Sequence, residues 1–254
     1  MQPAKRPYHR RRRAALSTAP ELQDELSRQT SETEACSAPA PSAQPARRRR
    51  RRSAAHAPAP APEPQVPLLP ALSKEEINAL PIGAWEGPVM LVRDEESLDE
   101  ALEAMWKEPG LGFDTETRPT FTKGAQSAPA LIQFASADMA WLIQLTHIPF
   151  SERIADLLAS PSILKCGVAI NDDMKALARI QQFAPAGVVD LALLARRKGI
   201  QAQGLRTLAA NLLGFRISKS MQCSNWEKPE LSAPQVKYAA TDAWVGRELY
   251  FRLI

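Results

Sequence analysis

Two carboxylates in the middle of the chain have the spacing of a metal-binding pair. Asp114 and Glu116 directly follow the apolar run Leu111–Phe113, which is typical of a buried strand. Residues two apart on a strand project to the same side of the sheet. Two acids placed together at a strand end repel each other unless a cation lies between them. The pair predicts a cation site, although an Asp-x-Glu pair by itself is more often a surface feature.

A tyrosine and an acid near the C-terminus form a second candidate pair. Tyr238 and Asp242 are four residues apart in a predicted helix, so they lie one above the other on one helical face. Their neighbours Ala239, Ala240 and Ala243 are small and let other groups approach closely. A tyrosine on a helix is more often a core residue than a catalytic one, so this pair alone does not decide a function.

Other acids stand at predicted helix starts. Asp173 opens the helix expected after the strand at 163–168, where an acid can be a cap or a partner of the helix dipole. Its neighbour Asp172 has the same local claim. Asp190, directly before an apolar helical run, is interpreted as a helix cap rather than as a further acid of a site.

The elements that must position these residues follow from hydrophobic periodicity and from breaker residues. Strands are expected at 89–92, 111–115, 130–135, 139–145, 163–168 and 188–189, and helices at 97–106, 154–158, 172–181, 191–197, 205–213 and 234–254. Ser97 is expected to cap the first of these helices, and Ser136–Asp138 indicates a hairpin turn. Early strands followed by alternating strands and helices predict an α/β fold, with a mixed sheet covered by helices.

The first 73 residues differ in composition from the rest. They hold 12 of the 22 prolines, the arginine runs Arg10–Arg13 and Arg47–Arg52, and a single aromatic residue, Tyr8. So few large apolar side chains cannot offset the entropy lost on ordering the backbone. We therefore expect a disordered Arg/Pro/Ala-rich basic tail at 1–72 and one domain at 73–254, which is long enough for a proper core.

Charge divides in the same way as composition. Residues 1–73 carry 13 basic and 6 acidic residues, a net of +7, and the remainder carries 19 basic and 22 acidic residues, a net of −3. A basic flexible arm suits loose, salt-sensitive attachment to nucleic acid. A solvated extension with no role of its own is the alternative.

Cysteine usage and apolar runs indicate the compartment. Cys36, Cys166 and Cys223 are widely spaced, which fits neither a disulfide framework nor a zinc site and favours a reducing compartment. No apolar run approaches the roughly 20 residues that span a bilayer, and the N-terminus lacks the apolar core of a signal peptide. We expect a cytoplasmic protein without a membrane partner, associated with the nucleoid if bacterial. An organellar transit peptide within residues 1–19 is the alternative, which Pro3 and Pro7 weaken.

Three segments, taken in order and spacing, resemble the exonuclease motifs of the DEDD superfamily, which is DnaQ-like. They are Leu-Gly-Phe-Asp-Thr-Glu, then Gly-Val-Ala-Ile-Asn-Asp-Asp-Met-Lys-Ala-Leu, then Tyr-Ala-Ala-Thr-Asp-Ala. The resemblance runs from about residue 75 to 254. It is closest to the tyrosine branch, which includes RNase D, the Werner-syndrome exonuclease domain and the proofreading domain of family A polymerases. Lys237 stands where the sister branch has a histidine, and His9, His56 and His147 match no such motif.

Further matches and the spacing of the second motif refine the resemblance. The further matches are Arg118-Pro119, Lys123-Gly124, Gln133, Gly204-Leu205, Leu208-Ala209 and Ser224–Pro229. In the family, the third acid stands three residues after the isoleucine of Gly-x-x-Ile and four before a leucine. This pattern assigns Asp173, between Ile170 and Leu177, and keeps Asp172 in reserve.

The resemblance implies an RNase H-like mixed sheet flanked by helices and a metal-dependent 3′-5′ exonuclease. Such an enzyme releases nucleoside 5′-monophosphates with two divalent cations, Mg²⁺ or Mn²⁺. By the family's pattern, Asp114 bridges both ions, Glu116 and Asp242 complete the site that activates water, and Asp173 holds the second ion. Tyr238, protonated at neutral pH because the reference pKa of a phenol is about 10, orients the attacking water.

Candidate substrate contacts lie beside the motifs, and two substrate classes fit the resemblance. Asn171, Arg118 and Lys123 flank the motifs and could meet phosphate or sugar, and ordinary surface polar residues are the alternative. Trp226 is interpreted as a packing residue rather than a base-stacking platform. RNase D proteins carry further helical domains after the exonuclease domain, whereas this chain ends at Ile254, so DNA is favoured over RNA trimming. A catalytically silent nucleic-acid-binding module, and an interaction protein working through its tail, are the other candidates.

Overall fold

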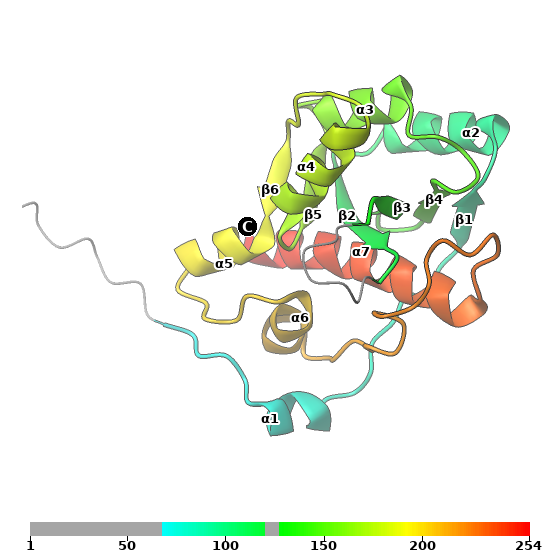
Figure 1. Ribbon diagram of the computed structural model, residues 1–254. Coiled ribbons are helices and arrows are strands. Elements are labelled where there is room, and N and C mark those ends of the chain that lie inside the picture. The colour runs from blue at the N-terminus through cyan, green and yellow to red at the C-terminus, as the bar shows by residue number, and fades with distance from the viewer. Residues whose placement is uncertain (1–67, 120–126) are drawn as a thin grey trace, which may run out of the picture. The chain divides into compact units, whose positions relative to one another are not determined.

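The computed structural model describes residues 68–119 and 127–254, which belong to one unit of the chain, Pro60–Ile254. The predicted tail up to residue 67 and the candidate contact Lys123 lie outside the described residues. Figure 1 shows a central sheet with helices on both faces, as the sequence predicts.

Six strands form a mixed sheet in the order β1-β4-β3-β2-β5-β6. Their bounds are β1 Val89–Val92, β2 Gly110–Thr117, β3 Pro129–Ala135, β4 Ala140–Gln144, β5 Leu164–Gly167 and β6 Val188–Asp190. β3 runs antiparallel to β2 and β4, while β1–β4, β2–β5 and β5–β6 are parallel. The hairpin expected around Ser136 is the β3–β4 turn, where the Ser136 amide donates to the Met139 carbonyl at 2.8 Å.

Helices cover both faces of this sheet. Their bounds are α1 Lys74–Ala79, α2 Glu95–Met105, α3 Glu152–Ala159, α4 Ile170–Ile180, α5 Leu191–Arg197, α6 Leu205–Leu213 and α7 Ala233–Leu253. α2, α3 and α4 share one apolar cluster with one face, and α5, α6 and α7 share another with the opposite face (Figure 1). Along β2 the side chains alternate between the two faces of the sheet. Phe113 packs edge-on against Phe134 in the first cluster, at 5.3 Å between ring centroids.

Helix starts are where the structure departs from the sequence-based expectations. Ser97 is not the cap of α2: the helix begins one turn earlier, after Asp94, whose carboxylate accepts from the Ser97 amide at 2.8 Å. The first helix, α1, was not expected. It is started by a capping box, in which Ser73 Oγ accepts from the Glu76 amide and the Glu76 carboxylate accepts from the Ser73 amide. A Ser-x-x-Glu signature in the sequence encodes this start.

The segment before β1 is attached to the α5–α6 side of the domain. Leu69 pairs with Ile200 in an isolated parallel bridge, and Ile82 pairs with Arg216 in another. The chain therefore follows the surface of the domain from Leu69 onward. Within the described residues, no helix is long and apolar enough to cross a membrane.

Candidate active site

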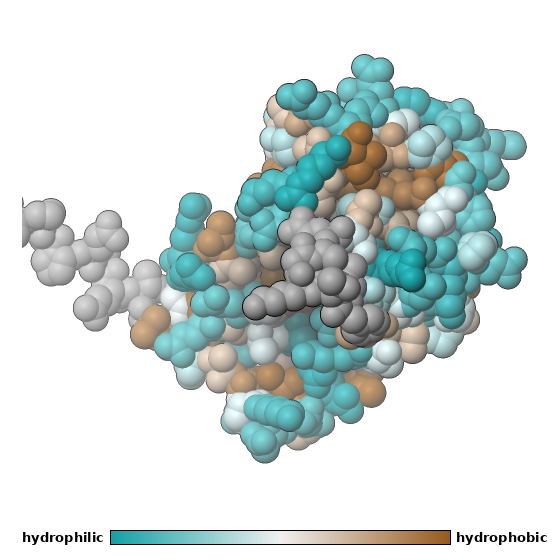
Figure 2. Space-filling model, in the orientation of Figure 1, coloured by the Kyte–Doolittle hydropathy of each residue, from teal (hydrophilic) through white to brown (hydrophobic). Residues whose placement is uncertain are grey.

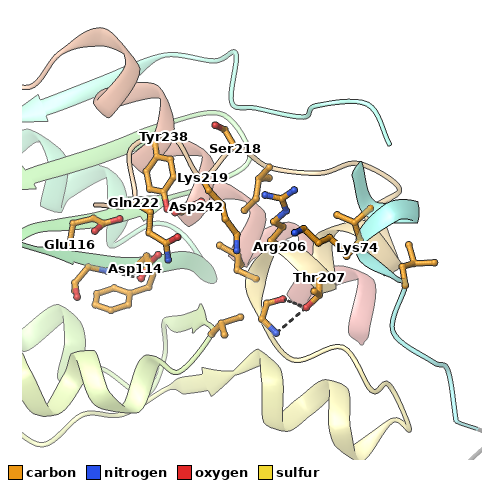
Figure 3. Close-up of a pocket in the computed structure, with 18 residues that line it drawn as sticks. Lys74, Asp114, Glu116, Arg206, Thr207, Ser218, Lys219, Gln222, Tyr238 and Asp242 are labelled. Atoms are coloured by element: carbon orange, nitrogen blue, oxygen red, sulfur yellow. Dashed lines mark hydrogen bonds between the residues drawn. The ribbon is translucent and has the colours of Figure 1, made fainter. Parts of the chain in front are cut away.

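The two acids of β2 and the tyrosine–acid pair of α7 open onto one cavity. Asp114, Glu116, Tyr238 and Asp242 all line it, and the cavity has a volume of about 830 Å³ (Figure 3). This size lies in the range of roughly 300–1,000 Å³ that small-molecule sites occupy. The alternation of side chains along β2 places both of its acids on the α7 side of the sheet, as the sequence predicts.

The distance between α7 and β2 is set by residues without side-chain bulk. A Cβ atom at Gly112 would lie 1.8 Å from the carbonyl oxygen of Ala243, and one at Gly246 would lie 2.8 Å from the carbonyl oxygen of Cys166. Ala243 is fully buried at this contact. The close approach is what brings Asp242, itself only 5% exposed, to the end of β2.

The third acid reaches the end of β2 from the opposite face. Thr115 Oγ1 donates to a carboxylate oxygen of Asp173 at 2.6 Å, so α4 directs this half-buried acid at the strand. Asp172 instead lies at the surface, where Lys175 donates to it at 2.8 Å. α4 begins at Ile170, directly after Ala169, which takes a left-handed conformation with φ of 58°. The geometry therefore favours Asp173 over Asp172 as the third acid.

Burial raises the pKa of all four acids, and repulsion from the other acids of the site adds to this at Asp114 and Glu116. Burial, followed by the charges of Asp242, Asp173 and Glu116, holds the pKa of Asp114 well above its usual value. Burial first, and then Asp242 and Asp173, raise the pKa of Glu116 to about 8. Burial likewise raises the pKa of Asp242 to about 7 and that of Asp173 to about 6, against the opposing hydrogen bonds from Tyr238 and Thr115. The site concentrates more negative charge than the surrounding protein stabilises.

Tyr238 is held as a protonated phenol. Burial, the Asp242 and Glu116 charges and its hydrogen bond to Asp242 all raise the pKa of Tyr238 above its usual range. Its ring lies 6.0 Å from that of Trp226, which is fully buried. The interpretation of Trp226 as a packing residue is thus confirmed, and Tyr238 presents a hydroxyl that can both donate and accept.

The donor set fits hard divalent cations. Carboxylate oxygens are the ligands that Mg²⁺ and Mn²⁺ prefer, and a bound cation would stabilise the ionised form of acids whose pKa burial raises. Among the described residues, however, no three His, Cys, Asp or Glu side chains converge closely enough to hold one ion. Asp114, Glu116 and Asp242 line the cavity, and Asp173 lies beside it at the end of β2.

The predicted substrate contacts do not gather at the cavity. Arg118 is an exposed residue that forms an ion pair with Glu227 at 3.3 Å, and Asn171 is exposed on the first turn of α4. Neither residue lines the cavity. Lys123 lies outside the described residues.

Two other interpretations can be compared with the structure directly. Lys237, at the position of the sister branch's histidine, forms an ion pair with Glu86 at 2.6 Å and does not line the cavity. Asp190 is a helix cap, as expected: its carboxylate accepts from the amides of Ala192 and Leu193 at 2.9 and 3.1 Å.

Three basic residues that the motifs do not predict line the same cavity: Lys74, Arg206 and Lys219. They lie on α1, on α6 and in the segment between α6 and α7. The capping box at the start of α1 and the Gly204-Leu205 match are the signals that could have drawn attention to Lys74 and Arg206. No local pattern ties residues so far apart in the chain to one site.

Comparison with known proteins places the chain in a family. A family model described as 3′-5′ exonuclease matches residues 89–253, well over half of the chain. Exonuclease 3′-5′ domain-containing protein 2 of Mus musculus is 30% identical over 210 residues, covering 70% of this chain and 32% of that protein. DNA polymerase I of Aquifex aeolicus is 31% identical over 159 residues, covering 63% of this chain and 26% of that protein. The chain thus spans about a third or less of the length of these relatives.

Solved structures agree on the fold. The EXO domain of Nibbler from Aedes aegypti superposes with a TM-score of 0.62 at 24% identity, covering 67% of this chain and 90% of that one. RNase D of Trypanosoma brucei in complex with RNA U12 gives a TM-score of 0.60 at 20% identity, covering 66% and 63%. The mixed sheet flanked by helices is therefore the RNase H-like fold of the DnaQ-like exonucleases, which generally use divalent metal ions. The chain belongs to the 3′-5′ exonuclease family.

Proposed function

We propose that this protein hydrolyses the last phosphodiester bond at the 3′ end of a nucleic acid, releasing nucleoside 5′-monophosphates in a metal-dependent reaction. The observation that carries the proposal is the convergence of Asp114, Glu116, Asp242 and Tyr238 on one cavity, in a chain of the 3′-5′ exonuclease family. Asp173 is the remaining acid of the site, since it lies against the end of β2 through Thr115. A tyrosine among these residues supports the tyrosine branch of the family.

The acids have the roles of cation ligands in this proposal. Asp114 would contact two divalent cations, Mg²⁺ or Mn²⁺, with Glu116 and Asp242 completing one site and Asp173 serving the other. When bound, two such ions activate the attacking water and stabilise the leaving oxygen. The raised pKa values of Asp114 and Glu116 mean that the ionised acids lack compensation, so cation binding and ionisation favour each other.

Tyr238 orients the attacking water rather than removing its proton. A phenol whose pKa lies above the usual range stays protonated at neutral pH, which excludes it as a general base. Its hydroxyl donates to Asp242 and retains lone pairs that can accept from a water molecule. The ring is fixed by its contact with Trp226, which holds the hydroxyl in place before substrate binds.

DNA is the favoured substrate, and 3′-end trimming of RNA is the second candidate. The relative with DNA in its name, DNA polymerase I, is 31% identical, whereas the RNA-bound RNase D structure is 20% identical and supports the fold alone. Matched DNA and RNA oligonucleotides, 5′-labelled and carrying recessed or overhanging 3′ ends, test the activity and the preferred substrate in Mn²⁺, Mg²⁺ or chelator. Stepwise shortening from the 3′ end that needs the metal and is faster on DNA is expected. No shortening of either polymer in either metal would contradict the proposal. It would favour the alternative of a catalytically silent nucleic-acid-binding module.

The domain boundaries belong to the same proposal: an exonuclease domain at 73–254 and a basic tail at 1–72 that adds non-specific contact and whose last residues, Leu69–Leu72, pack against the domain. The net charge of +7 over residues 1–73 supports this contact. Replacing Arg47–Arg52 by glutamine tests it. Weaker oligonucleotide binding with a flatter salt dependence is expected, and unchanged binding would contradict the tail's role.

A further inference from the structure

The cavity that holds the acids is electrically two-sided. Asp114, Glu116 and Asp242 lie on one side of it, and Lys74 and Arg206 on the other, with Lys219 between them (Figure 3). The basic residues come from α1, from α6 and from the segment that joins α6 to α7. The domain as a whole is slightly acidic, yet three basic side chains from separate parts of the chain line the cavity that contains the candidate catalytic residues.

The segment that carries Lys74 is fixed to the domain along its length. The amide of Leu72 donates to the Asn211 side chain at 3.1 Å, and the same side chain donates to the Pro70 carbonyl at 2.8 Å. Ile77 of α1 is buried and is itself part of the cavity wall. α1 therefore forms part of the cavity wall, and Lys74 lies at its first position.

Arg206 is held in position by the same helix. Its guanidinium donates to the Asn78 side chain at 2.9 Å, which joins α6 to α1 at the cavity. Among the described residues, Lys74 and Lys219 form no ion pair. Two exposed ammonium groups without an acidic partner leave positive charge available to an anion from outside.

We propose that Lys74, Arg206 and Lys219 bind backbone phosphates of the strand that remains after cleavage, on the 5′ side of the scissile bond. This inference rests on the proposed function. A strand with a free 3′-hydroxyl has no phosphate beyond the scissile one, which lies at the acids. Any other phosphate that reaches the basic side must therefore belong to the retained strand. Lysine and arginine contacts to phosphate are independent of sequence, as an enzyme that removes successive nucleotides requires.

The test compares substrates with and without upstream phosphates. A single-stranded oligonucleotide has them, while the p-nitrophenyl ester of thymidine 5′-monophosphate contains only the phosphate that reacts. For Lys74→Ala and Lys219→Ala we expect kcat/KM on the oligonucleotide to fall about tenfold each, the effect of removing one hydrogen bond to a charged group. Hydrolysis of the p-nitrophenyl ester should stay at the wild-type rate. Lys107→Ala, which removes an exposed lysine in the turn after α2 that is paired with Glu103, is the matched control.

The salt dependence and a neutral backbone identify the bound group as a phosphate. The log–log slope of oligonucleotide affinity against salt should decrease by about 0.7 for each phosphate of a single strand that a variant no longer neutralises. Oligonucleotides with one methylphosphonate, moved stepwise upstream of the scissile bond, should locate that phosphate. At the correct position, the neutral linkage weakens wild-type binding and abolishes the difference between wild type and variant. Arg206→Lys, which keeps the charge, should retain more affinity than Arg206→Ala.

Failure of this inference and failure of the proposed function give different results. Wild-type hydrolysis of both substrates, with variants equal to wild type on the oligonucleotide, overturns the phosphate subsite alone. Equal losses on both substrates also overturn it, because the lysines would then act on the reacting phosphate or on folding. No hydrolysis of either substrate by the wild type overturns the proposed function. In that case the oligonucleotide affinity of wild type and variants, measured in chelator by fluorescence anisotropy, still decides whether Lys74, Arg206 and Lys219 bind the strand.

Discussion

At the scale of single residues, protons and metal cations compete for the acids of the site. Their pKa values are raised in the folded protein, to about 8 for Glu116, about 7 for Asp242 and about 6 for Asp173. A carboxyl whose pKa is higher when folded binds protons more tightly in that state. Its contribution to stability is fully present below the unfolded pKa and is lost as pH rises through the folded value.

This sign predicts how the metal-free protein responds to pH. In chelator, the melting temperature should fall as pH rises from about 5 to about 8, a window set by the unfolded pKa near 4.5 and the folded pKa near 8 of Glu116. Glu116→Gln should flatten the upper part of this curve, and Glu103→Gln, at an exposed position paired with Lys107, should leave it unchanged. A wild-type curve that rises with pH over the window would show that the acids are not destabilised in the way described.

Tyr238 gives a second prediction at this scale. Tyr238→Phe removes the hydroxyl but keeps the ring against Trp226. We expect kcat to fall about a hundredfold, the cost of a misplaced reacting group, with KM and melting temperature close to wild type. Steady-state kinetics with thermal unfolding separate these effects. Full activity of the variant would assign the tyrosine to packing, the alternative that its position on a helix left open.

At the scale of elements, the spacing between β2 and α7 decides whether the two halves of the site meet. Gly112→Ala would place a methyl group 1.8 Å from the Ala243 carbonyl oxygen and force the helix away from the strand. We expect a loss of about 1–3 kcal/mol of stability and reduced activity, although Gly112 does not line the cavity. Gly110→Ala is the control on the same strand, because its Cβ would lie 3.6 Å from Leu164, an ordinary contact. Equal behaviour of the two variants would contradict the role of this close approach.

The elements that hold the acids could be predicted from the sequence, because their signals are local. Alternation predicted that Asp114 and Glu116 share a side, and the i, i+4 spacing predicted the same for Tyr238 and Asp242. Periodicity located every strand of the sheet to within a few residues. The helix starts differ from the prediction, because the capping boxes at Ser73 and Asp94 rather than hydrophobic periodicity set the beginnings of α1 and α2.

At the scale of the whole molecule, what the sequence could not predict depends on contacts between distant segments. Lys74 and Lys219 are 145 positions apart and share a cavity only because the chain from Leu69 onward packs beside α6. Figure 2 shows the surface in the orientation of Figure 1, where hydrophilic residues (teal) cover most of the visible face and apolar ones (brown) form small areas. By composition the tail is the basic part of the chain. The folded domain nevertheless has basic side chains of its own at the site.

Metal binding should stabilise the whole domain. Cations that bind the folded chain and not the unfolded one add about 2.7 kcal/mol at a hundred times their Kd, or roughly 5–10 °C in melting temperature for a domain of this size. We expect Mg²⁺ or Mn²⁺ to raise the melting temperature of the wild type over chelator, and Asp114→Asn to lose most of that rise. The same increase in wild type and variant would place the bound ions elsewhere.

The central claim is that the acids at the end of β2 and on α7 form one catalytic site, and a pair of substitutions tests it most directly. A 5′-labelled oligonucleotide is incubated with Mn²⁺ or Mg²⁺ and with wild type, Asp114→Ala or Asp172→Ala, and the shortening of its 3′ end is followed over time. We predict that Asp114→Ala abolishes shortening, because it removes the acid at the centre of the site. Asp172→Ala should retain the wild-type rate, since this acid lies at the surface beside Lys175. An Asp114→Ala protein that is folded and shortens the strand as fast as wild type would contradict the assignment of the site.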